Sequence, residues 1–82
     1  MWHVYFLELT NGDIYVGSAN DLRRRYASHQ AGRVLSTKAH LPTRLRSYVS
    51  VETEGQARDL GIYFKSGSGK AATLKRLIRK AG

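Results

Sequence analysis

The stretch "VYFLELTNGDIYVGSANDLRRRYASH", residues 4–29, decides the fold of this protein. It begins with two runs rich in β-branched and aromatic residues, and these runs flank Asn11 and Gly12. An Asn-Gly pair between two such runs is the strongest short-range signal of a β-hairpin. The stretch therefore predicts two antiparallel strands, and its second half predicts a helix.

The length of the hairpin loop decides which side chains share a face of the sheet. A two-residue turn would pair Leu9 with Ile14 and place Tyr5 and Tyr15 on opposite faces. A three-residue loop, with Gly12 at a positive φ, would place the two tyrosines on one face. The sequence permits both registers.

The segment "SANDLRRRYASHQAGR", residues 18–33, predicts the first helix. We expect Ser18 or Asn20 to cap its start and Gly32 to end it in the left-handed conformation. At about 100° per residue, one stripe of this helix mixes apolar and polar side chains. The stripe consists of Leu22, Arg25, Tyr26 and His29.

The middle of the chain predicts one more strand and a second helix. A polar connection over residues 33–43 leads to an alternating strand over residues 44–51. Thr53 and Gln56 have the spacing of a capping box and predict a helix over residues 53–65. Its inward stripe is expected to contain Ala57, Leu60, Gly61 and Phe64.

The segment "SGSG", residues 66–69, is expected to break this helix, and residues 70–80 predict a last amphipathic helix. We expect Leu74, Leu77 and Ile78 to point inward and Lys75, Arg76, Arg79 and Lys80 to point outward. The predicted fold class is α/β: a small three-stranded antiparallel sheet flanked by helices, in the order β-β-α-β-α-α. We expect one domain over residues 1–82.

Composition restricts the kinds of function. The chain has 82 residues, no cysteine and a formal net charge of +8, which excludes disulfides and thiolate metal sites. No apolar run approaches the roughly 20 residues of a membrane span, and no basic leader is visible. We therefore expect a soluble, cytoplasmic protein without a membrane partner. A basic surface is typical of a polyanion partner, usually nucleic acid, although a basic structural protein is also possible.

Arg25 and His29 stand one helical turn apart on the flank of the apolar stripe. Arginine can hold a phosphate through two parallel hydrogen bonds, and histidine can exchange a proton near neutral pH. Side chains at the edge of a stripe often only extend into water. The strand "YVG", residues 15–17, leads directly into this helix, and that context favours a functional pair.

The ordered set of these residues resembles the GIY-YIG nuclease family. Its two triplets appear as His3-Val4-Tyr5 and Tyr15-Val16-Gly17, its helical arginine as Arg25, and its following Tyr or His as His29. The first triplet departs from the family pattern at its glycine. The resemblance covers roughly residues 3–70 and includes the order of the predicted elements.

The resemblance implies a metal-dependent endonuclease that hydrolyses phosphodiester bonds in DNA, in preference to RNA, with Mg²⁺ or Mn²⁺. It implies Tyr5 as the general base, Tyr15 and His29 as orienting groups, and Arg25 on the scissile phosphate. The unperturbed pKa of a tyrosine is about 10, and we expect neighbouring cations to lower it for Tyr5. The resemblance also implies substrate contacts from Gly17, Lys38, Lys65 and Lys70.

Gly61 stands where the family carries its metal-binding glutamate, four residues after Ala57 and four before Lys65. No other acidic residue is expected at this place, so the resemblance implies an impaired or inactive endonuclease. The alternative is a non-catalytic nucleic-acid-binding module that retains the fold. The glycine could reflect natural loss or deliberate substitution of the glutamate, or close packing of the helix against the sheet.

Overall fold

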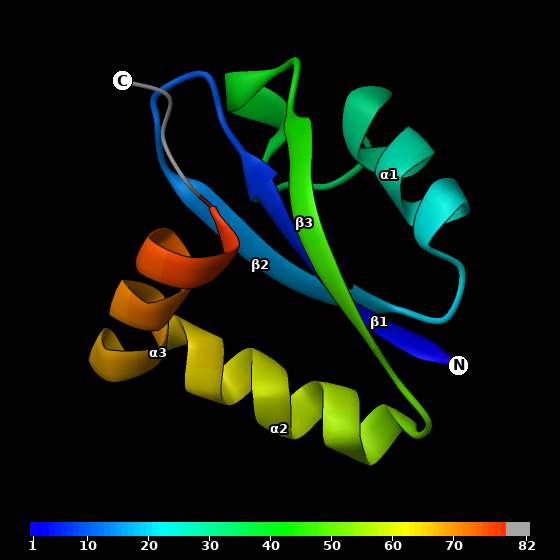
Figure 1. Ribbon diagram of the computed structural model, residues 1–82. Helices are drawn as coiled ribbons and strands as arrows, with labels where there is room; N and C mark the ends of the chain where they lie inside the picture. The colour runs from blue at the N-terminus through cyan, green and yellow to red at the C-terminus, as the bar shows by residue number, and fades with distance from the viewer. Residues whose placement is uncertain (79–82) are drawn as a thin grey trace.

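The computed structural model describes residues 1–78 and has the predicted α/β architecture (Figure 1). The strands are β1 (Trp2–Glu8), β2 (Ile14–Ala19) and β3 (Arg44–Val51). The helices are α1 (Leu22–Gln30), α2 (Glu54–Lys65) and α3 (Gly67–Ala72), with a 3₁₀ turn η1 (Lys38–His40) and a π turn η2 (Thr73–Leu77). The three strands form one antiparallel sheet in the order β2-β1-β3, which confirms the predicted fold class.

The hairpin between β1 and β2 has the three-residue loop. The Leu9 amide donates to the Asp13 carbonyl oxygen at 2.9 Å, and Gly12 has a φ of 89°. In this register Leu7 pairs with Tyr15 and Tyr5 pairs with Gly17. Tyr5 and Tyr15 therefore lie on one face of the sheet, as the second predicted register requires.

The two faces of the sheet carry two separate cores (Figure 1). On one face, Val4, Phe6 and Val16 pack with Ala57 and Ile78 around α2 and η2. On the other face, a second cluster packs beneath α1 and contains Tyr5, Leu7, Ala19, Tyr15, Leu22, Tyr26 and Leu45. The second cluster thus contains both tyrosines of the predicted active site.

The N-cap of helix α1 lies one residue after Asn20 and three residues after Ser18, the two predicted caps. Asp21, rather than Ser18 or Asn20, is the N-cap, and its carboxylate accepts from the Arg24 amide at 3.1 Å. The helix ends as predicted, because Gly32 has a φ of 75° and its amide donates to the His29 carbonyl oxygen. This cap holds the last turn of α1, which carries His29, in a defined place.

Helix α2 begins with the predicted capping box, in which the Thr53 hydroxyl accepts from the Gln56 amide and the Gln56 side chain accepts from the Thr53 amide. Ala57 is fully buried, and Leu60 and Phe64 are half-buried against the same core. The capping box and this apolar stripe fix the rotation of α2 about its axis.

The predicted break over residues 66–69 is wrong in its extent. Only Ser66 interrupts the helical chain, and its hydroxyl accepts from the Gly69 amide to start α3 at Gly67. Gly69 is buried against the Tyr63 carbonyl group, where a Cβ would overlap the backbone. Gly69 therefore permits a close corner between α2 and α3, and the run of Gly and Ser does not end the helical region.

The last predicted helix is correct in part. Lys75 and Arg76 are exposed, Leu77 is half-buried and Ile78 is buried, as predicted. Regular α-helix ends at Ala72, however, and a π turn follows. The predictions for the Leu74 side chain, Arg79 and Lys80 lie outside the described residues. Within residues 1–78, no helix has both the length and the apolar character needed to cross a bilayer.

Candidate active site

Tyr5 occupies the centre of the candidate site. It lies on β1, the middle strand, and only 1% of its surface is exposed. Gly17 faces it across the β1–β2 ladder, and a Cβ at residue 17 would overlap the phenol ring carbon and hydroxyl oxygen of Tyr5. The last residue of the second triplet is thus a glycine because the Tyr5 phenol occupies the space in front of it.

Helix α1 brings His29 to the Tyr5 hydroxyl. Tyr5 Oη and His29 Nε2 lie 2.8 Å apart, and the His29 side chain is fully buried. The Tyr15 and His29 rings are 5.1 Å apart between centroids, and those of Tyr5 and Tyr15 are 6.3 Å apart. The structure therefore brings the two predicted tyrosines and the predicted histidine into one aromatic cluster.

Thr37 is a member of this cluster that the sequence analysis missed. Its Oγ1 lies 2.8 Å from His29 Nδ1, and its side chain is fully buried. It comes from the connection after α1, where no periodic pattern marks it. A threonine is common in such a polar connection, so the signal that could have found it is its place directly before the predicted contact Lys38.

The hydrogen-bond geometry is consistent with one tautomer of His29. If the Thr37 hydroxyl donates to the Val34 carbonyl oxygen, 3.5 Å away, its oxygen is left to accept from Nδ1–H of His29. Nε2 then carries the lone pair and accepts from the Tyr5 hydroxyl. His29 is thereby set as a proton acceptor for Tyr5.

Burial affects the two partners in ways that keep both neutral. It raises the pKa of Tyr5, and the Arg25 guanidinium beside the phenol opposes this rise with a smaller effect. The expectation that neighbouring cations lower the Tyr5 pKa overall is therefore wrong, because desolvation of the phenolate outweighs them. Burial, and secondarily the charge of Arg25, lowers the pKa of His29.

The lowered pKa of His29 predicts a loss of stability in acid. Unfolded His29 takes up a proton near its ordinary pKa of about 6.5, whereas folded His29 resists protonation. The unfolded state therefore binds more protons as the pH falls below about 6.5, and the free energy of unfolding decreases there. Urea unfolding between about pH 8 and pH 5 measures this change. A His29→Gln protein should show a smaller decrease, and an equal decrease would show that another group causes it.

Arg25 lies at the exposed edge of the cluster. Its guanidinium interacts with both tyrosine phenols, and the contact with Tyr5 is the main cause of a raised Arg25 pKa. A cavity of about 270 Å³ opens beside it and is also lined by Arg24 and Ser28. A permanently charged, solvent-facing guanidinium next to two phenol groups is suited to an incoming phosphate oxygen.

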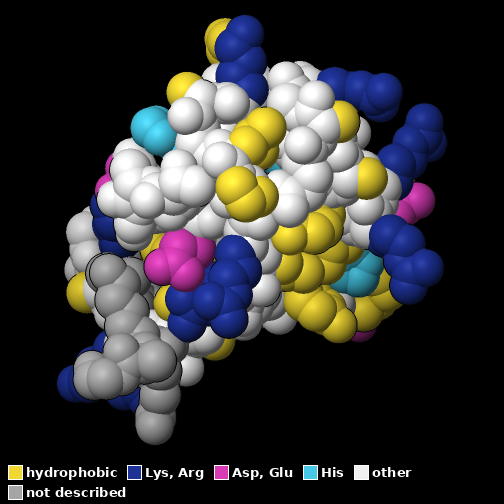
Figure 2. Space-filling model, turned by 90° about the horizontal axis from the view of Figure 1, so that it is seen from above, with side chains coloured by type: hydrophobic (Ala, Val, Ile, Leu, Met, Phe, Trp, Pro, Cys, Tyr) yellow, Lys and Arg dark blue, Asp and Glu magenta, His cyan; other side chains and the backbone are white. Residues whose placement is uncertain are grey.

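The predicted substrate lysines divide into two groups. Lys38 is exposed on η1, directly after Thr37. Lys65 and Lys70 are exposed near the ends of α2 and α3 and line a different cavity, which Tyr15 also borders. Figure 2 shows Lys and Arg side chains at several places on one face of the molecule, and the largest group of them lies beside an acidic side chain.

Gly61 lies at the margin of the buried stripe of α2. It is half-buried, and a Cβ built on it would meet no atom of another part of the chain within 4 Å. The interpretation that close packing requires glycine here is therefore wrong. Gly61 stands one turn before Lys65, so the two lie on the same flank of α2.

The donor groups around the site do not fit a divalent cation. Mg²⁺ and Mn²⁺ prefer carboxylate and other hard oxygen ligands. Across residues 1–78, no three His, Asp or Glu side chains come together as a metal site would need. Glu8, the acidic residue on β1, forms an ion pair with Arg46 at 2.6 Å.

Comparisons with known proteins find a matching family and similar proteins over most of this chain. A family model described as the GIY-YIG catalytic domain matches residues 1–75. A UPF0213 protein of Cupriavidus pinatubonensis is 39% identical over 57 residues, which are 68% of this chain and 63% of that protein. This chain thus spans less than two thirds of the length of that relative. A UPF0213 protein of Halobacterium salinarum is 36% identical over 58 residues, which are 70% of this chain and 75% of that protein.

A solved structure has the same arrangement. The solution NMR structure of the UPF0213 protein BH0048 from Bacillus halodurans matches with a TM-score of 0.58 and 26% sequence identity. The match covers 92% of this chain and 84% of that chain. The likeness therefore extends over nearly the whole sheet and its helices.

Proposed function

This chain belongs to the family of GIY-YIG catalytic domains, and on that premise we propose that it binds DNA through the architecture of a metal-dependent endonuclease. Its phosphodiester cleavage is impaired because Gly61 replaces the carboxylate that would hold the metal. The observation that carries the proposal is the cluster of Tyr5, His29, Tyr15 and Arg25, which meet on one face of the sheet.

In this proposal, each member of the cluster has a chemical task. Arg25 binds the scissile phosphate, because it is the exposed cation beside the two phenols. Tyr5 takes a proton from the attacking water while its own phenol proton passes to Nε2 of His29, 2.8 Å away. The water oxygen bonds to phosphorus as the bond from phosphorus to the leaving sugar oxygen breaks, and that oxygen takes up a proton from solvent. His29 becomes a cation in this step, and Tyr5 stays neutral throughout. Tyr15 orients the water and the ring of His29.

The relay explains how a tyrosine with a raised pKa can act as a base. A free phenolate would be costly in this buried place. Transfer to a neutral imidazole avoids the phenolate as a resting state, and the buried Thr37 holds the imidazole in the tautomer that accepts the proton. The same burial, together with the charge of Arg25, disfavours the imidazolium, so in this proposal protonated His29 is a transient state.

The metal that the family is expected to use supplies Lewis-acid stabilisation of the phosphate when it is bound. Gly61 offers no side-chain oxygen for it. We therefore propose that the chain retains phosphate binding and the proton relay but lacks the means to anchor Mg²⁺ or Mn²⁺.

The same observations support a second candidate function, a nucleic-acid-binding module without catalytic activity. The groups that would bind DNA do not need a metal: Arg25, Lys38, Lys65 and Lys70 are all exposed. Both functions predict binding that weakens as salt rises. They differ in whether a carboxylate at residue 61 produces cleavage.

An Arg25→Ala protein tests the binding site that both functions share. We expect its affinity for DNA at low salt to fall by about tenfold or more, because a hydrogen-bonded contact between two charged groups contributes about 1.5–3 kcal/mol. Fluorescence anisotropy with a labelled DNA measures the affinity. Arg23→Ala is the matched control, because Arg23 is equally exposed on α1 but borders a different cavity. Equal losses from both changes would contradict a specific role for Arg25.

A further inference from the structure

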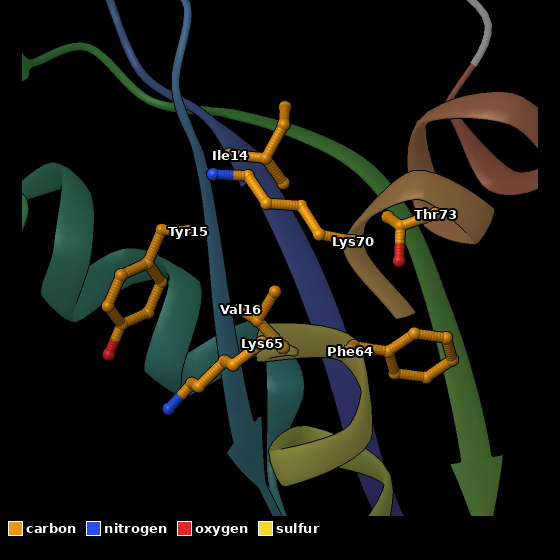
Figure 3. Close-up of a pocket in the computed structure, with 7 residues that line it drawn as sticks. All are labelled: Ile14, Tyr15, Val16, Phe64, Lys65, Lys70 and Thr73. Carbon is orange, nitrogen blue, oxygen red and sulfur yellow. The ribbon is translucent and has the colours of Figure 1, made fainter. Parts of the chain in front are cut away.

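A cavity of about 220 Å³ lies on the other side of Tyr15 from α1, between β2 and the corner of α2 and α3 (Figure 3). Its walls are largely apolar and include Ile14, Val16 and Phe64. The cation–phenol cluster of Tyr5, His29 and Arg25 does not line it. Tyr15 is the residue that borders both places.

Two lysines stand at this cavity. Lys65 comes from the last turn of α2 and Lys70 from α3, and Figure 3 shows both side chains reaching toward β2. Both are exposed, and neither has an ion-pair partner among residues 1–78. The cavity therefore combines an apolar interior with two uncompensated cations.

We propose that this cavity binds one unpaired base of a nucleic-acid strand, with the phosphates on either side of the base held by Lys65 and Lys70. The proposal rests on the proposed function, since it extends the DNA site beyond Arg25. It assigns the chain a preference for single-stranded or locally unpaired nucleic acid over continuous duplex.

The size and chemistry of the cavity fit a single planar ring. Pockets that enclose a whole drug-sized ligand measure roughly 300–1,000 Å³, so about 220 Å³ accommodates one part of a larger ligand. Apolar and aromatic walls such as Ile14, Val16 and Phe64 contact any base through its face, irrespective of its sequence. The two lysines complement the phosphates that accompany a base in a strand.

The base must be unpaired for a physical reason. A paired base in duplex DNA has both faces stacked, and it must leave the stack to enter a side cavity. That extrusion costs a few kcal/mol in a duplex and little in a single strand. A duplex would therefore contact the lysines with its phosphates but leave the cavity without a base.

The position of Tyr15 connects this cavity to the proposed cleavage site. In Figure 3 its phenol points away from the cavity, toward α1, where it meets His29. A strand with one base in the cavity would thus pass the edge of β2 toward Arg25. The geometry orders the contacts as cavity, Tyr15 and then Arg25 along one strand.

The test compares three labelled DNA probes: a short single strand, its duplex, and a strand of the same length in which sugars and phosphates are kept but the bases are absent. We expect the protein to bind the single strand about fivefold or more tightly than the base-free strand at the same salt concentration, because stacking of one base has this effect. We also expect the duplex to bind more weakly than the single strand. Equal affinities for the single strand and the base-free strand would overturn the proposal.

A cavity-filling variant locates the effect. Ile14→Trp places a large ring at the wall of the cavity, and we expect it to remove the advantage of the single strand over the base-free strand. Ile62→Trp is the matched control, because Ile62 is 66% exposed and does not line the cavity. If Ile14→Trp binds the single strand as the unchanged protein does, the cavity is not the site.

A second variant tests the lysines without disturbing the apolar core. Lys65→Ala with Lys70→Ala should reduce the slope of log affinity against log salt by about 0.7 for each lost phosphate contact on single strands. Lys75→Ala, an exposed lysine outside the cavity, is the charge control. An unchanged slope in the double variant would overturn the proposal.

The outcomes separate this proposal from the proposed function. If Arg25→Ala weakens binding while the cavity and lysine variants have no effect, the DNA site stands and the base site is wrong. If a free deoxynucleoside monophosphate fills the cavity as tightly as a strand does, a small nucleotide is the occupant and the strand proposal is overturned.

Discussion

Replacing Gly61 by glutamate is expected to increase Mg²⁺- or Mn²⁺-dependent nicking of DNA by about a hundredfold or more over the present chain. The reason is that a bound metal supplies several kcal/mol of transition-state stabilisation, and each 1.4 kcal/mol corresponds to about tenfold in rate. A carboxylate provides the oxygen ligand that these ions prefer. The measurement is the conversion of supercoiled plasmid to the nicked form with and without the metal.

The structure indicates that the glutamate can be accommodated. A Cβ at residue 61 meets no atom of another segment within 4 Å, and Gly61 is already half-buried in the middle of α2. Glutamate is favoured over glycine in a helix interior by somewhat less than about 1 kcal/mol. We therefore expect the Gly61→Glu protein to fold and to be at least as stable as the present chain, so that a gain or absence of activity reflects chemistry.

Two control variants separate the effect of the glutamate charge from the effect of removing a glycine from the helix. Gly61→Gln has nearly the same shape without the negative charge, and Gly61→Ala gains the same helical preference without any ligand atom. We expect neither to cut DNA. If Gly61→Glu cuts neither DNA nor RNA, the result favours the nucleic-acid-binding module without catalytic activity. If the present chain cuts as fast as Gly61→Glu, residue 61 is not the metal position.

Local patterns predicted most of the fold because each depends on neighbouring residues alone. The capping box at Thr53 and Gln56, the left-handed Gly32 and the strand over residues 44–51 all follow from short-range geometry. The two possible hairpin registers differ by one loop residue. The structure was needed to choose between them, because the choice depends on which side chains the sheet buries on each of its two faces.

One error arose where packing between helices overrides local preference, and another where several neighbouring residues can play the same local role. A run of Gly and Ser normally ends a helix. Here α3 begins at Gly67, within that run, and Gly69 packs against the Tyr63 carbonyl group. Asp21 caps α1 because its side chain, among the polar residues at this turn, accepts from the Arg24 amide. The first outcome depends on packing between α2 and α3. The Asp21 cap is a contact between residues three apart, and Ser18, Asn20 and Asp21 are all residue types that cap helices.

The sequence motifs predicted which residues make up the candidate site. They did not predict how burial changes the pKa of these residues. Tyr5, Tyr15, Arg25 and His29 were identified from ordered motifs, and the structure brings them together. Whether the pKa of Tyr5 is raised or lowered depends on how deeply its side chain is buried, which only the packed structure reveals. Burial favours the neutral phenol of Tyr5 over the expected phenolate, and Thr37 is hydrogen-bonded to His29.

Gly17→Ala is expected to lower both the stability of the protein and the activity of the candidate site. The added methyl group would overlap the Tyr5 phenol and lie 3.0 Å from a ring carbon of Tyr15. Gly17 does not have a positive φ, so this collision, and not backbone strain, is the cost. Overpacking of a buried place costs about 1–3 kcal/mol of stability. Urea unfolding measures that loss.

The larger effect of Gly17→Ala should be on catalysis. The overlap forces Tyr5 or its surroundings to shift, which we expect to disturb the 2.8 Å contact between its hydroxyl and Nε2 of His29, and a displacement of about 1 Å can cost about a hundredfold in rate. In a Gly61→Glu background we therefore expect cleavage to fall by that factor while DNA binding through Arg25 changes little. Gly67→Ala is the control, since a Cβ there meets open space. Full cleavage by the Gly17→Ala, Gly61→Glu protein would show that the contact between Tyr5 and His29 is not part of the reaction.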